Sequence, residues 1–338
     1  MSANPMLYRP EVSTCNMGHR TLFAVLFLFT ALGGNSLANG QEQQNRVWKL
    51  NDQQPGMVNV LRNDQEVTTL HYKEFQRPIL FPIRNGRDEN VTRSWPVVEG
   101  VAGEATDHPH HKSLWFGHGD VNGASFWDES AKIENQDITL DQAIPAITLK
   151  NHWLVDGKKI AADTTTISFG QASQLPDWWI DYRVVVDADQ EDLVFGDTKE
   201  GTFAIRTHPN LRLNNDEKRG VTTAAGHALN QAGDQDKELW GKRSPWVLYW
   251  GPIGKDATSL VMMDHPTNLR HPTTWHAREY GLVAANPFGL SFFEKAGKGA
   301  GDFTLKKGEQ LVMHYRVLIA DEQLTAEQVE KEYKEFAK

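Results

Sequence analysis

The sequence predicts an all-β protein, a large antiparallel β-sandwich with a C-terminal helix. Short runs rich in Val, Ile, Thr and aromatic residues recur along the chain, separated by Gly, Pro, Asn and Asp. Several runs alternate with a period of two, as in 179–186, where Ile180, Tyr182 and Val184 share one face. The sequence has no βαβ alternation and no glycine-rich dinucleotide loop, so a doubly wound fold is not expected.

Length and charge limit the remaining possibilities. The chain has 338 residues, enough for one large domain or two ordinary ones. No Pro/Ser-rich linker divides it, so residues 45–338 are expected to form a single domain. The formal net charge is −9 and there is no basic block, which argues against a nucleic-acid partner.

The first forty residues are expected to be a signal peptide. Residues 21–34 carry no charge and follow Arg20, a run too short to span a bilayer. Small residues at 36–40 suit a cleavage site, so the mature protein is expected to be secreted or periplasmic and free of the membrane. The only cysteine, Cys15, would leave with this segment, and no disulfide would remain. An uncleaved membrane anchor is the alternative.

The remaining elements can be placed in order along the chain. One helix is expected near the C-terminal end, because Thr325 and Gln328 form a capping box and Val329, Tyr333 and Phe336 then share one face. This helix is expected to pack on a sheet. The expected strands are 67–72, 79–83, 114–117, 164–169, 179–186, 203–213, 260–264, 282–285 and 311–319.

Histidines give the strongest chemical signal. Seven of the thirteen lie in two short windows, 107–123 and 264–276. Four of the thirteen are followed by Pro, which favours an extended conformation for the preceding histidine and holds its imidazole on a stiff segment. If 108–111 is extended, His108 and His110 point one way and His111 the other. The same reasoning would place His118, Asp120 and Asn122 on one face.

Two chemistries compete for this cluster, beside the ordinary interpretation that each His is structural. Imidazoles and a carboxylate can exchange protons with a small polar substrate, or two or three His and an Asp can hold a divalent metal. There is no His-Glu-x-x-His motif and no cysteine pair, so metal-free acid–base chemistry is preferred and no cofactor is assigned. Glu200 is a candidate general base. Arg206 is a candidate for binding a carboxylate or hydroxyls of the substrate, and it is expected to share a strand face with His208.

An ordered set of motifs carries a resemblance to a known family. The segments are 77–82, 91–94, 107–111, 114–116, 119–123, 126–127, 196–201, 240–243, 264–268, 271–276, 280–281 and 286–289. Together they resemble a bacterial family, often exported, that is a domain of unknown function labelled "methane oxygenase PmoA". The resemblance covers nearly all of 45–320. Members usually carry Arg where this chain has Lys112, and Val-Asp is common at 124–125, where it has Ala-Ser; neither difference removes a histidine.

The resemblance implies a fold similar to the mutarotase-like supersandwich, which carbohydrate epimerases, lyases and hydrolases also use. The membrane-embedded methane monooxygenase subunit of the same name is not implied, because no apolar run after residue 40 approaches spanning length.

We therefore expect an exported enzyme that acts on a sugar derivative as a lyase, epimerase or hydrolase. The alternatives are a non-catalytic carbohydrate-binding module and a metal-dependent oxygenase. The expected catalytic residues are His108, His110, His111, Glu200 and His276, brought together in one concave pocket. The expected substrate-binding residues are His118, Asp120, Asn122, Trp127, Arg206, His265, Asn268, His271, Trp275 and Asn286. The expected partner is a small molecule or a glycan.

Overall fold

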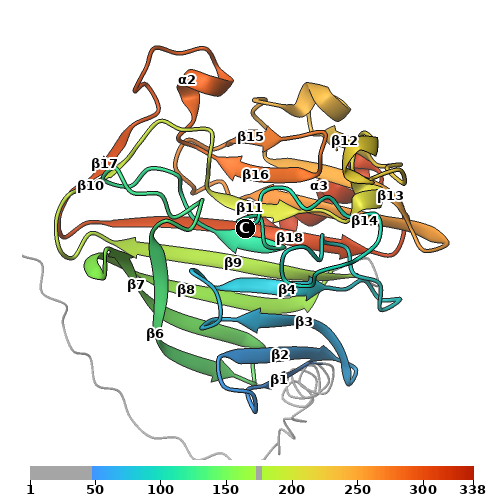
Figure 1. Cartoon of the computed structure of the whole chain (residues 1–338), viewed down its shortest axis with the longest axis horizontal. Coiled ribbons are helices and arrows are strands. Elements are labelled where there is room, and N and C mark those ends of the chain that lie inside the picture. Colours follow the sequence, from blue (N-terminus) through green and yellow to red (C-terminus); the bar gives the residue numbers. More distant parts are fainter. Residues whose placement is uncertain (1–47, 173–176) are drawn as a thin grey trace, which may run out of the picture. The chain divides into compact units, whose positions relative to one another are not determined.

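The computed structural model describes residues 48–172 and 177–338 (Figure 1). The expected signal peptide and Cys15 lie outside this part of the chain. The described residues belong to one compact unit. No helix in the described ranges has both the length and the apolar character needed to cross a membrane.

Two eight-stranded sheets form the framework of the described chain, and their neighbouring strands pair antiparallel. Across the first sheet the order is β1 (Trp48–Asn51), β2 (Met57–Arg62), β3 (Gln65–His71), β4 (Ile79–Ile83), β5 (Leu114–Phe116), β11 (Phe203–Arg206), β16 (Leu282–Asn286) and β15 (Thr274–Ala277). Across the second sheet it is β12 (His227–Asn230), β13 (Trp246–Ile253), β14 (Asp256–Asp264), β18 (Gln310–Ala320), β9 (Trp178–Asp187), β8 (Lys158–Gln171), β7 (Ala146–Val155) and β6 (Lys132–Asp141).

The smaller elements lie between these strands in the chain, except α3, which follows the last strand. They are the strand pair β10 (Leu193–Phe195) and β17 (Phe303–Leu305), the helices α2 (Leu290–Phe293) and α3 (Ala326–Phe336), and the 3₁₀ turns η1 (Pro209–Leu211), η2 (Glu217–Arg219) and η3 (Asp236–Leu239).

The two sheets pack face to face through their apolar sides. Phe203 of β11 stacks on Tyr315 of β18, with ring centroids 4.8 Å apart, and also contacts Tyr182 of β9. Alternation separates the faces: Leu260 and Met262 of β14 join the core between the sheets, whereas their neighbours point outward. The prediction of an antiparallel β-sandwich is therefore confirmed.

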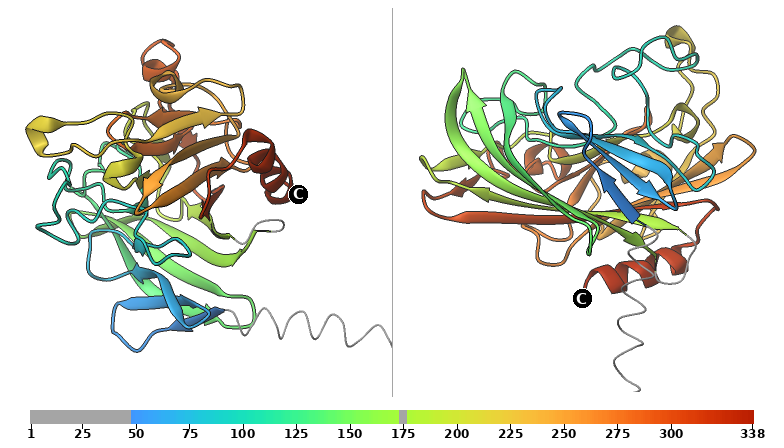
Figure 2. Two further views of the ribbon diagram at one scale, coloured as in Figure 1. Left: turned by 90° about the vertical axis from the view of Figure 1, so that its right-hand side faces the viewer. Right: turned by 90° about the horizontal axis from the view of Figure 1, so that it is seen from below.

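Helix α3 covers the outward face of the second sheet. Its N-cap Thr325 and Gln328 form the predicted capping box, and Val329, Tyr333 and Phe336 are buried against outward side chains of β13, β14 and β18. Figure 2 shows this helix, at the red end of the colour scale, against the outside of that sheet. The predicted helix and its buried face are confirmed.

The outward face of the first sheet is covered by long loops instead. Strand residues with outward side chains form a separate apolar cluster with Trp127 from the loop after β5. The connection between β4 and β5 runs along this face, since the backbone N–H of Arg93 bonds to the carbonyl of Arg206. This loop carries His108, His110 and His111 of the first histidine window, so the first sheet is their platform.

One predicted strand, 203–213, is wrong in its second half. Strand β11 ends at Arg206, and Pro209 begins the 3₁₀ turn η1, whose N-cap is His208. Proline has no N–H for the ladder and fits the first position of a helical turn. Arg206 and His208 therefore do not share a strand face.

Candidate functional site

A row of side chains crosses the outward face of the first sheet beneath the candidate site. In the strand register Trp115 of β5 pairs with Ala204 of β11, Ala204 with Ala284 of β16, and Ala284 with His276 of β15. Paired residues of antiparallel strands point to the same face, so two small side chains separate a tryptophan from a histidine.

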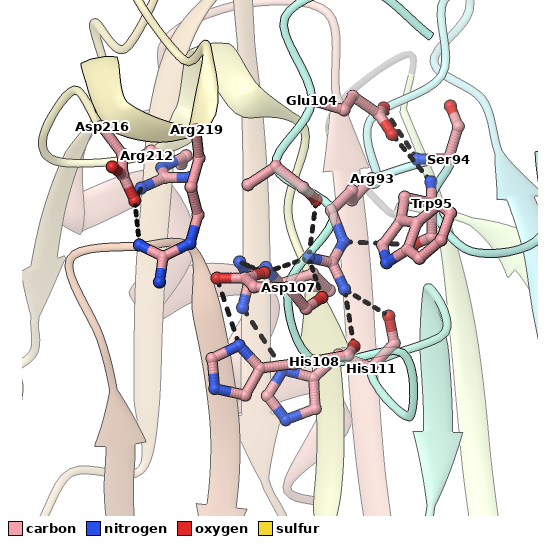
Figure 3. Close-up of polar contacts among 12 residues, drawn as sticks. Arg93, Ser94, Trp95, Glu104, Asp107, His108, His111, Arg212, Asp216 and Arg219 are labelled. Atoms are coloured by element: carbon pink, nitrogen blue, oxygen red, sulfur yellow. Dashed lines mark hydrogen bonds and ion pairs between the residues drawn. The ribbon is translucent and has the colours of Figure 1, made fainter. Parts of the chain in front are cut away.

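The first histidine window folds as a tight turn above this row. The N–H of His111 bonds to the carbonyl of His108 at 3.0 Å, and His108 has a positive φ of 45°. The prediction that 108–111 is extended is therefore wrong. Arg93 fixes the turn, because its guanidinium donates to the backbone carbonyls of Asp107, His108 and His111 (Figure 3).

Four aromatic rings form a column above the sheet. Tyr280 stacks on His108, His108 on His111 and His111 on Trp115, with centroid separations of 5.3, 4.8 and 5.3 Å. His110 meets His111 edge-on at 4.5 Å. The imidazoles of His108, His110 and His111 are thus in mutual contact. The side chain of His108 is 40% exposed.

Asp107 anchors the column electrostatically. Its Oδ1 accepts hydrogen bonds from Arg93 at 2.6 Å and Arg206 at 3.0 Å, and its Oδ2 lies 3.2 Å from His108 Nδ1. Burial alone would raise the Asp107 pKa, but the hydrogen bond with His108 and the charges of Arg206 and Arg93 outweigh it and hold the pKa below its ordinary value. Asp107 is therefore ionised at neutral pH.

The imidazoles behind His108 are held neutral. Burial, followed by the charge of Arg77, lowers the pKa of His110 to about 4. Burial, followed by the charge of Arg206, lowers the pKa of His111 well below its ordinary value. Arg206 Nη1 lies 3.3 Å from His111 Nδ1, and a guanidinium can only donate. His111 Nδ1 is therefore the acceptor, and Nε2 carries the proton.

Several buried donors near this turn have no partner within the protein. The Nε2 of His111 is one, and the indole nitrogens of Trp115 and Trp127 are two more. All three residues are at most 1% exposed and their rings are in contact. Buried N–H groups without acceptors are costly and rare, so this region is suited to binding polar atoms.

His276, on β15, and Glu200, in the loop before β11, approach the same region. Burial, then the charges of Lys199 and Arg278, lower the pKa of His276 to about 3, and a backbone hydrogen bond to Lys199 opposes them. His276 Nδ1 has no partner and is available as an acceptor. Glu200 forms an ion pair with Lys199, and its charge contributes to the raised pKa of Tyr280, behind burial as the main cause.

The other residues of the second window form a different cluster under α3. Asp264 is fully buried and accepts from Asn268 at 2.7 Å and from His271 at 2.7 Å. The Nε2 of His271 faces the Tyr333 hydroxyl at 3.3 Å, and His265 stacks on His314. The structure thus brings His276 to the first window and places His265, Asn268 and His271 elsewhere.

The remaining predicted binding residues make structural contacts. His118 bonds to the Gly196 carbonyl and Asp120 to the N–H of Gly123. Asn286 caps the turn that follows β16. Asn122 has a positive φ of 53° and pairs with the backbone of Asp192 and Val194, so the expected extended 118–122 face does not form. Trp275 points into the core between the sheets, where its indole N–H donates to the Ser244 carbonyl.

Sequence reasoning gave no role to the residues that organise the site. Asp107, Arg93 and Tyr280 all lie in the family motifs, but the arginines that bind Asp107 and the histidine that stacks on Tyr280 are distant in the chain. Arg212 is another residue of the site, and it is 4% exposed. Burial lowers its pKa, and the nearby negative charge of Asp107 opposes this effect. No motif marked Arg212.

The expected pocket and metal can be compared with the geometry. An open cavity of about 430 Å³ is lined by Asp236, Glu238 and Glu279. Glu279 precedes Tyr280 in the chain, but no residue of the histidine cluster lines this cavity. Within 48–172 and 177–338, no three His, Cys, Asp or Glu side chains are grouped so that they could hold a metal ion. No step of the chemistry is therefore assigned to a metal.

The model of a family of unknown function, DUF6807, matches residues 57–334. No curated protein matches the chain. Several solved structures are similar, among them these two. One is a 4-alpha-glucanotransferase from Thermococcus litoralis, with 12% identity, a TM-score of 0.30 and coverage of 85% of this chain, which spans 41% of the glucanotransferase. The other is a galactose mutarotase related enzyme from Lactobacillus acidophilus, with 10% identity, a TM-score of 0.29 and coverage of 82% of this chain and 100% of that one.

Proposed function

The chain belongs to the DUF6807 family of unknown function, and we propose that it is an acid–base enzyme acting on a sugar derivative, with His108 as the residue that exchanges protons with the substrate. One observation carries the proposal: His108, the exposed imidazole of the cluster, bonds through Nδ1 to a carboxylate that two buried guanidiniums hold ionised. An Asp in this position orients a histidine and stabilises the imidazolium that forms.

The tautomer follows from this hydrogen bond. With its proton on Nδ1, directed at Asp107, His108 has its lone pair on Nε2, and Figure 3 shows Nε2 pointing away from Asp107. His110 and His111 stay uncharged behind it, so they do not repel an imidazolium at His108 at neutral pH.

Epimerases and lyases share a first step that suits this arrangement. His108 Nε2 takes the proton from a carbon next to a carbonyl or carboxylate, and the C–H electron pair moves to form an enolate on the substrate oxygen. Return of a proton to the other face gives the epimer. Expulsion of a β-oxygen substituent, which takes up a proton as it leaves, gives the lyase product. A hydrolase is the third member of the proposed class.

The sugar class remains part of the proposal. A sugar needs many hydrogen-bonding groups around one or two aromatic surfaces, and the site offers Tyr280, Glu200, Lys199 and Arg278 around His108. His276 Nδ1 is a second unpartnered acceptor in the same region and is proposed as the partner in proton transfer.

Turnover of a panel of native and oxidised sugars tests the proposal. The variant His108→Gln should abolish turnover of whichever sugar is accepted while its folded structure persists. The matched control is His227→Gln, because His227 is an exposed histidine on β12 that also faces a carboxylate, Asp236, at 3.9 Å. If wild-type protein binds sugars but turns none over, the carbohydrate-binding module is the better description. If His108→Gln retains full turnover, the role of His108 is wrong.

The proposed location depends on the N-terminal segment. We propose that residues 1–40 act as a signal peptide and that the mature protein is secreted or periplasmic. N-terminal sequencing of protein recovered from the periplasm or the medium tests this, and a start at residue 1 would contradict cleavage.

A further inference from the structure

Positive charge is concentrated around the proposed catalytic pair, although the whole chain carries a formal net charge of −9. The guanidiniums of Arg93, Arg206, Arg212, Arg219 and Arg278 gather around Asp107 and Tyr280. The carboxylates that answer them are Asp107, Asp216 and Glu104. Lys199 and Glu200 neutralise each other. Guanidiniums therefore outnumber carboxylates beside His108.

The arginines are close enough to oppose one another's charge. Burial lowers the pKa of Arg206 to about 9, and the charge of Arg93 is the next largest cause. Burial also lowers the pKa of Arg93, and the charge of Arg212 adds to it. Arg93 and Arg206 nevertheless already donate hydrogen bonds to Asp107 and to the histidine turn. An anion near them would relieve this repulsion without displacing those bonds.

Arg212 has spare hydrogen-bonding capacity. It is 4% exposed, and its Nε has no partner within the protein. It forms an ion pair with Asp216, whose Oδ2 lies 3.8 Å away and already accepts from Arg219 at 2.7 Å. Figure 3 shows Arg212 and Arg219 converging on Asp216, beside Asp107 and His108. Two guanidiniums thus share one carboxylate at the edge of the proposed site.

We propose that the substrate bears a carboxylate, as an acidic sugar does, and that Arg212 and Arg219 bind this carboxylate beside the Asp107–His108 pair. The sugar part of this inference rests on the proposed function, whereas the carboxylate part rests on the arginines. Guanidinium forks match carboxylates geometrically, and charge-assisted bonds of this kind are stronger than neutral ones. A substrate carboxylate next to the reacting carbon would also place the positive charge where an enolate develops.

Isothermal titration with matched sugars tests the inference. The probes are glucuronate against glucose and galacturonate against galactose, at low and high salt. We expect the uronates to bind about tenfold or more tightly than the neutral parents, as one charge-assisted contact allows, and the preference to shrink at high salt.

Three arginine variants test whether the preference for uronates comes from Arg212 and Arg219 or from the overall charge of the protein. Arg219→Gln should remove most of the preference, and because Arg219 is exposed it should fold. Arg212→Lys keeps the charge of the buried residue and should weaken the preference. Arg183→Gln, which removes an exposed arginine on β9, is the control and should leave the preference intact.

The outcomes distinguish this inference from the proposed function. Uronate binding that survives in His108→Gln, with no turnover by wild-type protein, supports the carboxylate site and contradicts the enzyme. If neutral sugars are turned over, and uronates are neither turned over as fast nor inhibit this turnover, the carboxylate site is contradicted. The proposed enzymatic function is then still supported. Equal binding of both members of each pair, no binding of either, or an unchanged preference in Arg219→Gln overturns the inference.

Discussion

The Nδ1 of His108 lies 3.2 Å from the Oδ2 of Asp107, its immediate neighbour in the chain. Adjacent residues in an extended strand point to opposite faces and cannot make this contact. The positive φ of His108, 45°, turns its ring back toward Asp107. The pairing therefore depends on Arg93, which binds the backbone carbonyls of the turn and the Asp107 side chain together.

Replacing Asp107 tests how strongly this network holds the fold. Asp107→Asn removes the charge of the carboxylate that two buried guanidiniums, those of Arg93 and Arg206, share. We expect the free energy of unfolding to fall by about 2–4 kcal/mol, because breaking one side of a buried ion pair strands the other. Urea denaturation followed by tryptophan fluorescence measures this.

An exposed aspartate provides the control for that variant. Asp137 faces Lys150 at 3.7 Å with both side chains more than half exposed, and Asp137→Asn should change the unfolding free energy by less than about 0.5 kcal/mol. Equal losses in the two variants would mean that the Asp107 network contributes no special stability.

Buried neutral histidines predict a fall in stability on acidification. Burial is the main cause that lowers the pKa of His118 to about 4 and of His276 to about 3. The unfolded chain protonates histidine near pH 6.5, so below this pH the unfolded state binds more protons than the folded one. Each group should therefore lower the unfolding free energy by up to about 1.4 kcal/mol per pH unit between pH 6.5 and its folded pKa.

Chemical denaturation between pH 7 and 4.5 measures this slope. His276→Gln should flatten it, because glutamine does not titrate. His227→Gln, which replaces a histidine whose side chain is 60% exposed, is the matched control variant. A slope that His276→Gln leaves unchanged would show that His276 is protonated in the fold.

The cluster of Asp264, Asn268 and His271 under α3 is expected to affect the stability of the protein but not its activity. His271 links Asp264 to Tyr333 of α3. His271→Ala should lower the unfolding free energy by about 1–3 kcal/mol, because the fully buried Asp264 loses a hydrogen-bond donor. Turnover of an accepted sugar should be unchanged, whereas His276→Ala should reduce it. Loss of turnover in His271→Ala at normal stability would instead place His271 in the site.

The sequence predicted the strands that carry many β-branched and aromatic residues, and β4 agrees at both ends. It did not predict β6, where four polar residues follow one another at 134–137, because tertiary pairing with β7 supplies what local propensity lacks. The helix α3 was predictable because its capping box and apolar face are local. Asp107, whose role depends on Arg206 ninety-nine positions away, was not.

The arrangement of the site also has a kinetic consequence. Asp107 meets Arg206 across 99 residues, and the ring of Tyr280 joins His108 only when the hairpin of β15 and β16 has docked beside β11. Loop-closure entropy opposes such distant pairings, and chains dominated by them fold slowly. The His108 column should therefore be among the last parts to assemble during refolding, and its appearance would report that the first sheet is complete.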